Sequence, residues 1–287
     1  MDLLASPFMV RALIAAALVG ITAPAIGTYL VQRRQAVMGD GLGHVAMTGV
    51  AIGFVLNTSP VWMATLVAVV GAVAMELIRS RGKTSGDVAL SMLFYGGLAG
   101  GVMIMHMGGG STTKLLSAMF GSITAVAPED LTAMAILAAF VLAVTIGLRR
   151  QLFAVCQDEE FARVTGLPVR ALNLLIAITA AVTVTVAMRI VGLLLVSAMM
   201  VIPVATAQRV TRGFATTLGL AVAISLAVAL TGTATTYYLD APSGAMIVLL
   251  AIAVFMAMTA LSAPLARRRA KAARTAEEVC TRDDVKV

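Results

Sequence analysis

Charged residues are scarce in this chain, and their scarcity excludes most classes of soluble protein. Asp, Glu, Lys and Arg together make up 12% of the 287 residues, whereas hydrophobic residues make up 60%. Soluble domains contain about 25% charged residues, and a water-soluble core of this size could not hide so many apolar side chains. The composition excludes a soluble enzyme, a disordered regulator and a secreted module, and it predicts an integral membrane protein.

Cysteines and catalytic motifs are also scarce. The two cysteines, Cys156 and Cys280, lie in basic segments, which argues against a disulfide. The sequence has no Gly-x-x-x-x-Gly-Lys-Ser/Thr phosphate loop, no His-Glu-x-x-His zinc helix and no Gly-x-Ser-x-Gly nucleophile motif. We therefore expect no catalysis within this polypeptide, so any uphill transport must take its energy from a partner or from an ion gradient.

Long apolar stretches make up most of what is present. A bilayer core about 30 Å thick needs about 20 apolar residues in a helix. Stretches of that length predict an all-α, polytopic fold with about nine transmembrane helices, with eight as the alternative. The predicted spans are 8–31, 36–57, 60–78, 87–107, 130–148, 171–188, 191–208, 214–238 and 243–264. Within the least regular parts, LLSAMFGSI is expected to form only an interfacial helix, and Pro203 is expected to break its span.

Basic residues gather between the predicted spans. Lys and Arg number 21 against 14 Asp and Glu, a formal net charge of +7. Cytoplasmic loops are rich in Lys and Arg, and nine spans put every basic cluster on one side of the membrane. This predicts an N-terminus outside and a C-terminus in the cytoplasm. The charge is therefore expected to face the lipid bilayer and not nucleic acid. The chain divides into a transmembrane domain, 1–264, and a basic and mixed-charge tail, 265–287.

Two polar side chains within the second span, Asp40 and His44, need an explanation. They lie four residues apart, so they share one face of a helix. Intramembrane charged groups are costly and mark substrate pathways. A carboxylate with an imidazole suits zinc and also accepts manganese or ferrous iron, and two ligands are too few for a closed structural site. We predict a transient metal site. The alternative is that Asp40 caps its helix and His44 only packs.

A polar segment between the fifth and sixth spans, about 149–170, predicts a docking site. Asp158, Glu159 and Glu160 begin a short helix, and Gly166 ends it. A short amphipathic helix is a common way to engage a soluble subunit. The side chains expected to face that subunit are Phe161, Ala162 and Val164. The alternative is a solvated connector.

Three segments carry motifs of a known family. MGDGLGHVAMTGVA resembles Met-x-Asp-x-x-x-His followed by Gly-Val/Ile-Ala, DEEFARVTGLPVRALNLL resembles an Asp-x-x-x-Ala-x-x-x-Gly coupling loop, and VGLLLVSAMMVIPVATAQ resembles a Val-Gly-x-x-Leu-Val-x-Ala span that contains a proline. The chain thus resembles the membrane permeases of bacterial ABC importers for zinc and manganese, a vitamin B12/metal-chelate type of importer. Among these it is most similar to zinc-uptake permeases.

The resemblance implies a subunit of an importer in the bacterial cell membrane. Its implied partners are a second copy of the chain, a cytoplasmic ABC ATPase dimer that uses the ATP, and an extracytoplasmic metal-binding protein. No covalently bound cofactor is implied, and Zn²⁺ or Mn²⁺ is the transported substrate. Asp40 and His44 would line the metal pathway. Asp158, Ala162 and Gly166 would contact the ATPase, together with the neighbouring coupling residues Glu159 and Phe161.

The transport interpretation includes a gating element and leaves rivals open. Ser197 and Pro203 lie in the proline-containing span and are expected to take up the movement between outward and inward access. The first rival is a gradient-driven secondary metal transporter, in which Asp40 and His44 relay protons. The others are a membrane-embedded enzyme and a structural subunit without a transport pathway.

Overall fold

The apolar stretches form helices throughout the part of the chain that the structure describes. This computed structural model describes residues 7–80, 86–110, 128–239 and 242–261. The helices are α1 (Pro7–Gln32), α2 (Met38–Val55), α3 (Pro60–Ser80), α4 (Gly86–Met107), α6 (Pro128–Gly147), α7 (Arg149–Gln157), α8 (Glu159–Val164), α9 (Val169–Val191), α10 (Leu193–Val210), α11 (Phe214–Leu239) and a last helix, Ser243–Leu261. The predicted interfacial helix in LLSAMFGSI and the tail 265–287 lie outside the described residues.

The number of spans agrees with the sequence prediction. Within the described ranges, eight helices are long and apolar enough to cross a membrane. A ninth is present if α6 and α7, which bend by 67° at their junction, are counted as one span. The all-α fold with eight to nine spans is therefore confirmed for the described part of the chain.

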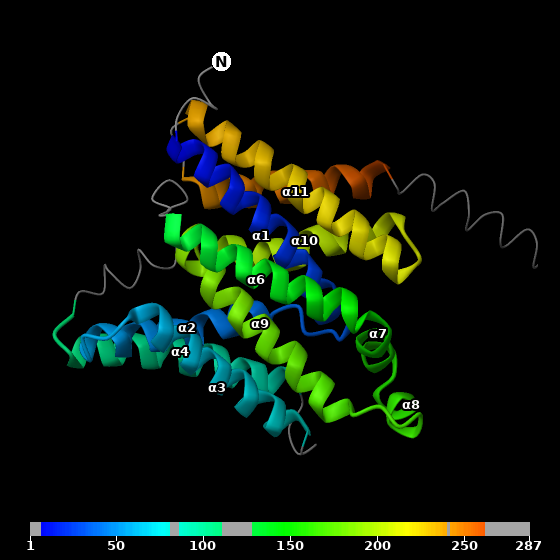
Figure 1. The fold of residues 1–287 in the computed structure, drawn as a ribbon, viewed down its shortest axis with the longest axis horizontal. Coiled ribbons are helices and arrows are strands. Elements are labelled where there is room, and N and C mark those ends of the chain that lie inside the picture. The colour runs from blue at the N-terminus through cyan, green and yellow to red at the C-terminus, as the bar shows by residue number, and fades with distance from the viewer. Residues whose placement is uncertain (1–6, 81–85, 111–127, 240–241, 262–287) are drawn as a thin grey trace, which may run out of the picture.

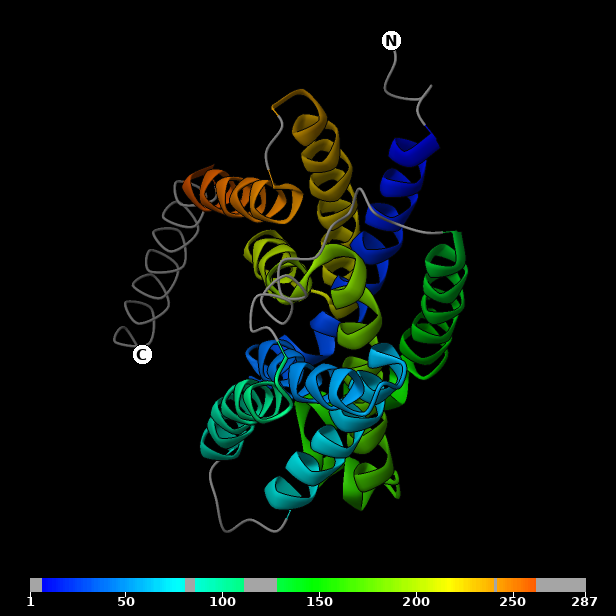
Figure 2. The same ribbon diagram turned by 90° about the vertical axis from the view of Figure 1, so that its left-hand side faces the viewer.

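The helices form two groups that α9 joins. In one group α2 packs against α3 and α4, and in the other α1 packs against α10 and α11. Figure 1 shows α9 crossing between α6 and the α2–α4 group, with α7 and α8 lying beyond the ends of α6 and α9. Figure 2 shows the same separation from the side. Because α10 also contacts α2, the predicted metal-binding span and the proline-containing span lie next to each other.

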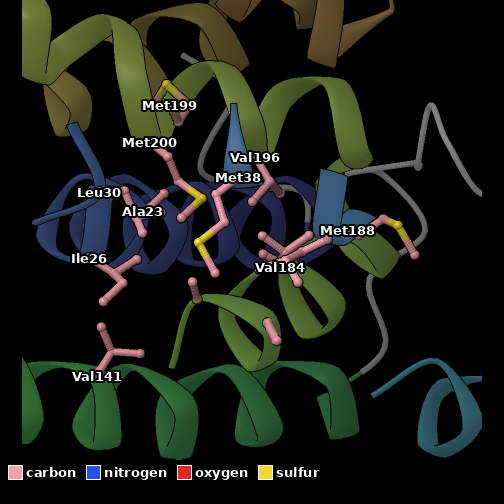
Figure 3. Packing of buried hydrophobic residues seen from close by; sticks show 14 of the residues in the cluster. Ala23, Ile26, Leu30, Met38, Val141, Val184, Met188, Val196, Met199 and Met200 are labelled. Atoms are coloured by element: carbon pink, nitrogen blue, oxygen red, sulfur yellow. The ribbon is translucent and has the colours of Figure 1, made fainter. Parts of the chain in front are cut away.

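The core is built from aliphatic side chains and methionines that several helices contribute (Figure 3). Ile26 and Leu30 of α1, Val141 of α6, Val184 of α9 and Met200 of α10 are all buried there. Lipid supplies no hydrophobic driving force between helices, so close packing of this kind stabilises the bundle. Small residues permit that packing. At Gly27 of α1, for example, an added Cβ would overlap the backbone carbonyl of Met200.

Helix α10 is not broken at its proline, although a break was predicted there. Helix α10 continues through Pro203, and the chain changes direction at Gly192, which has φ 85° and separates α9 from α10. The expectation of a span broken at Pro203 was wrong. A proline removes one backbone hydrogen bond, which a packed membrane helix can tolerate, whereas a positive φ at Gly192 interrupts the helical path itself.

Candidate functional site

Helix α2 carries both predicted metal ligands in its first two turns. Asp40 lies in the first turn, where the helix dipole favours a carboxylate. The N-cap residue is Val37 and no side chain caps this helix end, so Asp40 is not the cap that the alternative required. Close approach to neighbouring spans positions the helix. A Cβ added at Gly43 would overlap the side chain of Leu193 at the start of α10.

The structure brings Asp40 and His44 together and adds Ser197. His44 Nε2 lies 4.0 Å from Asp40 Oδ2, and the hydroxyl of Ser197 donates to Asp40 Oδ1 at 3.5 Å. The His44 side chain is only 8% exposed, whereas that of Asp40 is 38% exposed. The imidazole also packs edge-on against Phe94 of α4, with ring centroids 4.3 Å apart. The imidazole of His44 is therefore buried and held in one orientation, while the carboxylate of Asp40 beside it is partly exposed. Pro203 lies farther along α10, outside these contacts.

This arrangement can hold a cation only weakly within one chain. Zinc ligands lie about 2.0–2.2 Å from the ion, so two ligands of one tetrahedral ion are about 3.3 Å apart. The 4.0 Å separation of Asp40 and His44 approaches that value. Among the described residues, no group of three or more His, Cys, Asp or Glu side chains is placed to hold a metal. The other histidine, His106, is exposed in the last turn of α4. The geometry suits brief coordination completed by ligands from elsewhere.

The predicted docking helix is present as α8. Asp158 is its N-cap, and its Oδ1 accepts hydrogen bonds from the backbone N–H groups of Glu160 and Phe161 at 2.9 and 3.0 Å. Gly166 follows the helix with φ 82°, a conformation that favours glycine. The sequence signals at both ends of this helix are therefore confirmed as local structure.

The outward face of α8 differs from the predicted one at Ala162. Phe161 and Val164 are 64% and 87% exposed, as a docking surface requires. Ala162 is fully buried, which corrects the expectation that it faces a partner. Ala162 lies on the one face of this short helix that packs on the rest of the chain, whereas its neighbours Phe161 and Arg163 are exposed.

We expect replacement of Asp158 by Ala to fray α8. The variant loses both capping hydrogen bonds, a change that costs about 1 kcal/mol at a helix N-terminus. Hydrogen exchange should show faster exchange of the Glu160 and Phe161 amides. Asp158→Asn is the matched control, because its side-chain oxygen can still accept the bonds. Equal exchange in the Ala variant and the parent would contradict the capping role.

Sequence reasoning missed a cluster of charged side chains that joins α8 to the bundle. Glu159 Oε1 accepts hydrogen bonds from Arg33 at 3.1 Å, Arg79 at 2.8 Å and Asn173 at 3.1 Å. Arg79 also bonds both carboxylate oxygens of Glu76, at 2.8 and 3.0 Å. One signal was available: Glu76 is a lone carboxylate in an apolar stretch, three residues before Arg79.

The cluster keeps Glu159 ionised. Burial raises the pKa of Glu159, but the hydrogen bond and charge of Arg79, with the charge of Arg33 and the hydrogen bond from Asn173, outweigh it and hold the pKa below its ordinary value. Glu159 was predicted to face the ATPase. In the structure one oxygen of its carboxylate bonds Arg33, Arg79 and Asn173 of the same chain, and its side chain remains one-third exposed.

The helices and their apolar surfaces define a polytopic membrane protein. Residues 5–262 match the family model of the ABC 3 transport family. The chain therefore belongs to this family, and the family resemblance of its three motifs is confirmed.

Curated relatives carry names of metal transport systems. The chain is 31% identical over 177 residues to the manganese transport system membrane protein MntC of Halalkalibacterium halodurans, a match that covers 62% of this chain and 61% of that protein. It is 29% identical over 163 residues to the high-affinity zinc uptake system membrane protein ZnuB of Haemophilus influenzae, covering 57% and 62%. The chain thus spans about three fifths of the length of the curated relatives it matches.

Two solved structures share the fold. PsaBC from Streptococcus pneumoniae, in complex with Fab, superposes with a TM-score of 0.79 at 27% identity, covering 90% of this chain and 92% of that chain. An inward-facing conformation of a putative metal-chelate type ABC transporter superposes with a TM-score of 0.68 at 15% identity, covering 90% and 87%. The predicted fold type is confirmed.

Proposed function

We propose that the chain is the membrane-spanning subunit of an ATP-driven importer for a divalent transition metal. The observation that carries the proposal is the Asp40–His44 pair on α2, with Ser197 of α10 bonded to the carboxylate. Membership of the ABC 3 transport family supports it. The relatives named for manganese, zinc and chelated iron transport support a metal as the substrate.

Zinc is the proposed metal, with manganese or iron as alternatives. The imidazole nitrogen of His44 favours zinc over manganese in the usual affinity order. One chain offers too few ligands to retain the ion, and a second copy would supply another Asp40–His44 pair. We propose that an extracytoplasmic metal-binding protein releases the ion between two copies, where these side chains briefly replace its water. Weak, shared coordination allows the ion to leave again.

The energy for transport is proposed to come from a separate subunit. The chain lacks a phosphate-binding loop, so a cytoplasmic ABC ATPase dimer would hydrolyse the ATP. The exposed Phe161 and Val164 of α8 offer it an apolar contact. We propose that α8 and the basic clusters face the cytoplasm of a bacterial cell, with the N-terminus outside and the C-terminus inside, and that the basic charge serves the membrane and not a nucleic acid. The ion pairs that join Arg33, Arg79 and Glu159 support the proposal that these segments lie on the same side of the membrane.

Uptake of radioactive zinc and manganese tests the proposal directly. Cells would express the chain with its ATPase and metal-binding protein, and the control would carry an ATPase that cannot hydrolyse ATP. We expect zinc uptake with the active ATPase and background uptake with the inactive one. Uptake that persists with the inactive ATPase would favour a gradient-driven transporter instead. No uptake of either metal by the intact complex would contradict the proposed function.

A further inference from the structure

A partly buried ionic cluster joins four separate segments at the end of the bundle next to α8. Its members are Arg33 before α2, Glu76 and Arg79 of α3, Glu159 of α8 and Asn173 of α9. We propose that this cluster transmits movement of α8 to the helix that carries Asp40 and His44, and so couples ATP hydrolysis in the partner to access at the metal site. The inference rests on the proposed function.

Glu159 attaches α8 firmly to the spans. A single oxygen of its carboxylate accepts three hydrogen bonds, two of them from arginines. Bonds of this charge-assisted kind are stronger than neutral ones. Ala162, three residues along on the same face of this short helix, is also buried against the chain. A partner that pulls on the exposed Phe161 and Val164 must therefore move the arginines or break their bonds to Glu159.

Both arginines are connected to α2, one through the chain and the other through helix packing. Arg33 lies in the connection 33–37, which directly precedes the first turn of α2 and Asp40. Arg79 lies near the end of α3, and α3 packs along α2. Displacement of either arginine thus acts on the helix that carries the two proposed ligands. A packed helix transmits such a shift because its interior resists compression.

The ion pairs of the cluster can also form in a second arrangement. Arg33 bonds Glu159 at 3.1 Å, and its same nitrogen lies 4.0 Å from Glu76. Arg79 already holds both oxygens of Glu76. If α8 withdraws, Arg33 can shift to Glu76, and both arginines keep a carboxylate while Glu159, already one-third exposed, moves into water. Two discrete arrangements that share the same charges are what a coupling element requires.

The reconstituted full complex distinguishes transmission from simple docking. Metal transported per ATP hydrolysed would be measured with zinc ions for the parent, Glu159→Gln and Glu76→Gln. The neutral variants should keep ATPase binding and ATP hydrolysis but lose about fivefold or more of the transport per ATP, the lower end of usual coupling. Glu76 is buried, so its effect cannot come from contact with the ATPase. His106→Gln, an exposed side chain in the last turn of α4 and outside both α8 and the cluster, is the control and should keep the parental ratio.

Further variants keep the test independent of folding. Arg79→Lys retains the charge but not the planar fork that bonds two carboxylates, so it should also lower the ratio. Parental ratios in Glu159→Gln and Arg79→Lys would overturn the inference, while ATP-driven transport by the parent would leave the proposed function intact. Loss of ATPase binding in Glu159→Gln would also overturn it, in favour of direct docking. If the parental complex itself does not transport, the proposed function fails.

Discussion

Replacement of His44 or Asp40 by Ala should reduce zinc uptake by at least about tenfold, since even indirect changes at metal sites commonly cost 10–100-fold. Each variant removes one of the two side chains that can coordinate the ion within a chain, and symmetry would remove it twice in a dimer. Asp40→Asn should behave similarly because its amide is neutral and a much weaker ligand. The measurement is initial uptake at equal surface expression.

The second histidine of the chain supplies a matched control for this prediction. His106 is exposed at the end of α4, away from the Asp40 contacts, so His106→Ala should keep the parental rate. If His44→Ala and Asp40→Ala also keep it at normal expression, the metal-pathway assignment is wrong. The chain would then need a different pathway or act as a structural subunit.

Replacement of Gly27 by Ala should strongly destabilise the fold. The new Cβ would overlap the backbone carbonyl of Met200, where α1 crosses α10, and a backbone atom cannot move aside as a side chain can. Overpacking of a core costs about 1–3 kcal/mol, occasionally more. We expect a large fall in thermal stability in detergent and little monodisperse protein by size-exclusion chromatography.

A substitution at a glycine that has no close neighbours is the control, because it changes helix propensity without changing packing. An added Cβ at Gly219 of α11 meets nothing within 4 Å. Gly219→Ala should therefore leave stability equal or raise it slightly, because Ala is favoured over Gly by about 1 kcal/mol in a helix interior. Opposite signs for the two substitutions are the expected result. Equal stability of Gly27→Ala and the parent would show that α1 and α10 do not cross as closely as described.

Most of the helical layout could be predicted because it depends on local properties. The span predicted at 36–57 is α2, Met38–Val55, and the span predicted at 171–188 is α9, Val169–Val191. Apolar length alone identifies such segments, since a bilayer requires about 20 apolar residues for each crossing. The two ends of α8 could also be predicted from local sequence, because Asp158 caps its N-terminus and Gly166 follows its C-terminus with a positive φ.

Errors arose where the outcome depends on neighbours. Pro203 was expected to break its helix, but α10 continues through it, because neighbouring helices of a membrane bundle can support the backbone around a proline. Ala162 was expected to face a partner, yet it is buried against the bundle. In both cases the residue type permits either outcome, and only its surroundings decide which one occurs.

Composition and the geometry of single helices were enough to predict the membrane class, the spans and the placement of Asp40 and His44 on one helix face. The packing of the helices was needed to show that Ser197 of α10 donates to Asp40 and that Glu159 bonds Arg33 and Arg79. These partners are far apart in the chain. Their meeting depends on how the helices cross, and an apolar pattern that satisfies the bilayer equally well in many packings does not specify that crossing.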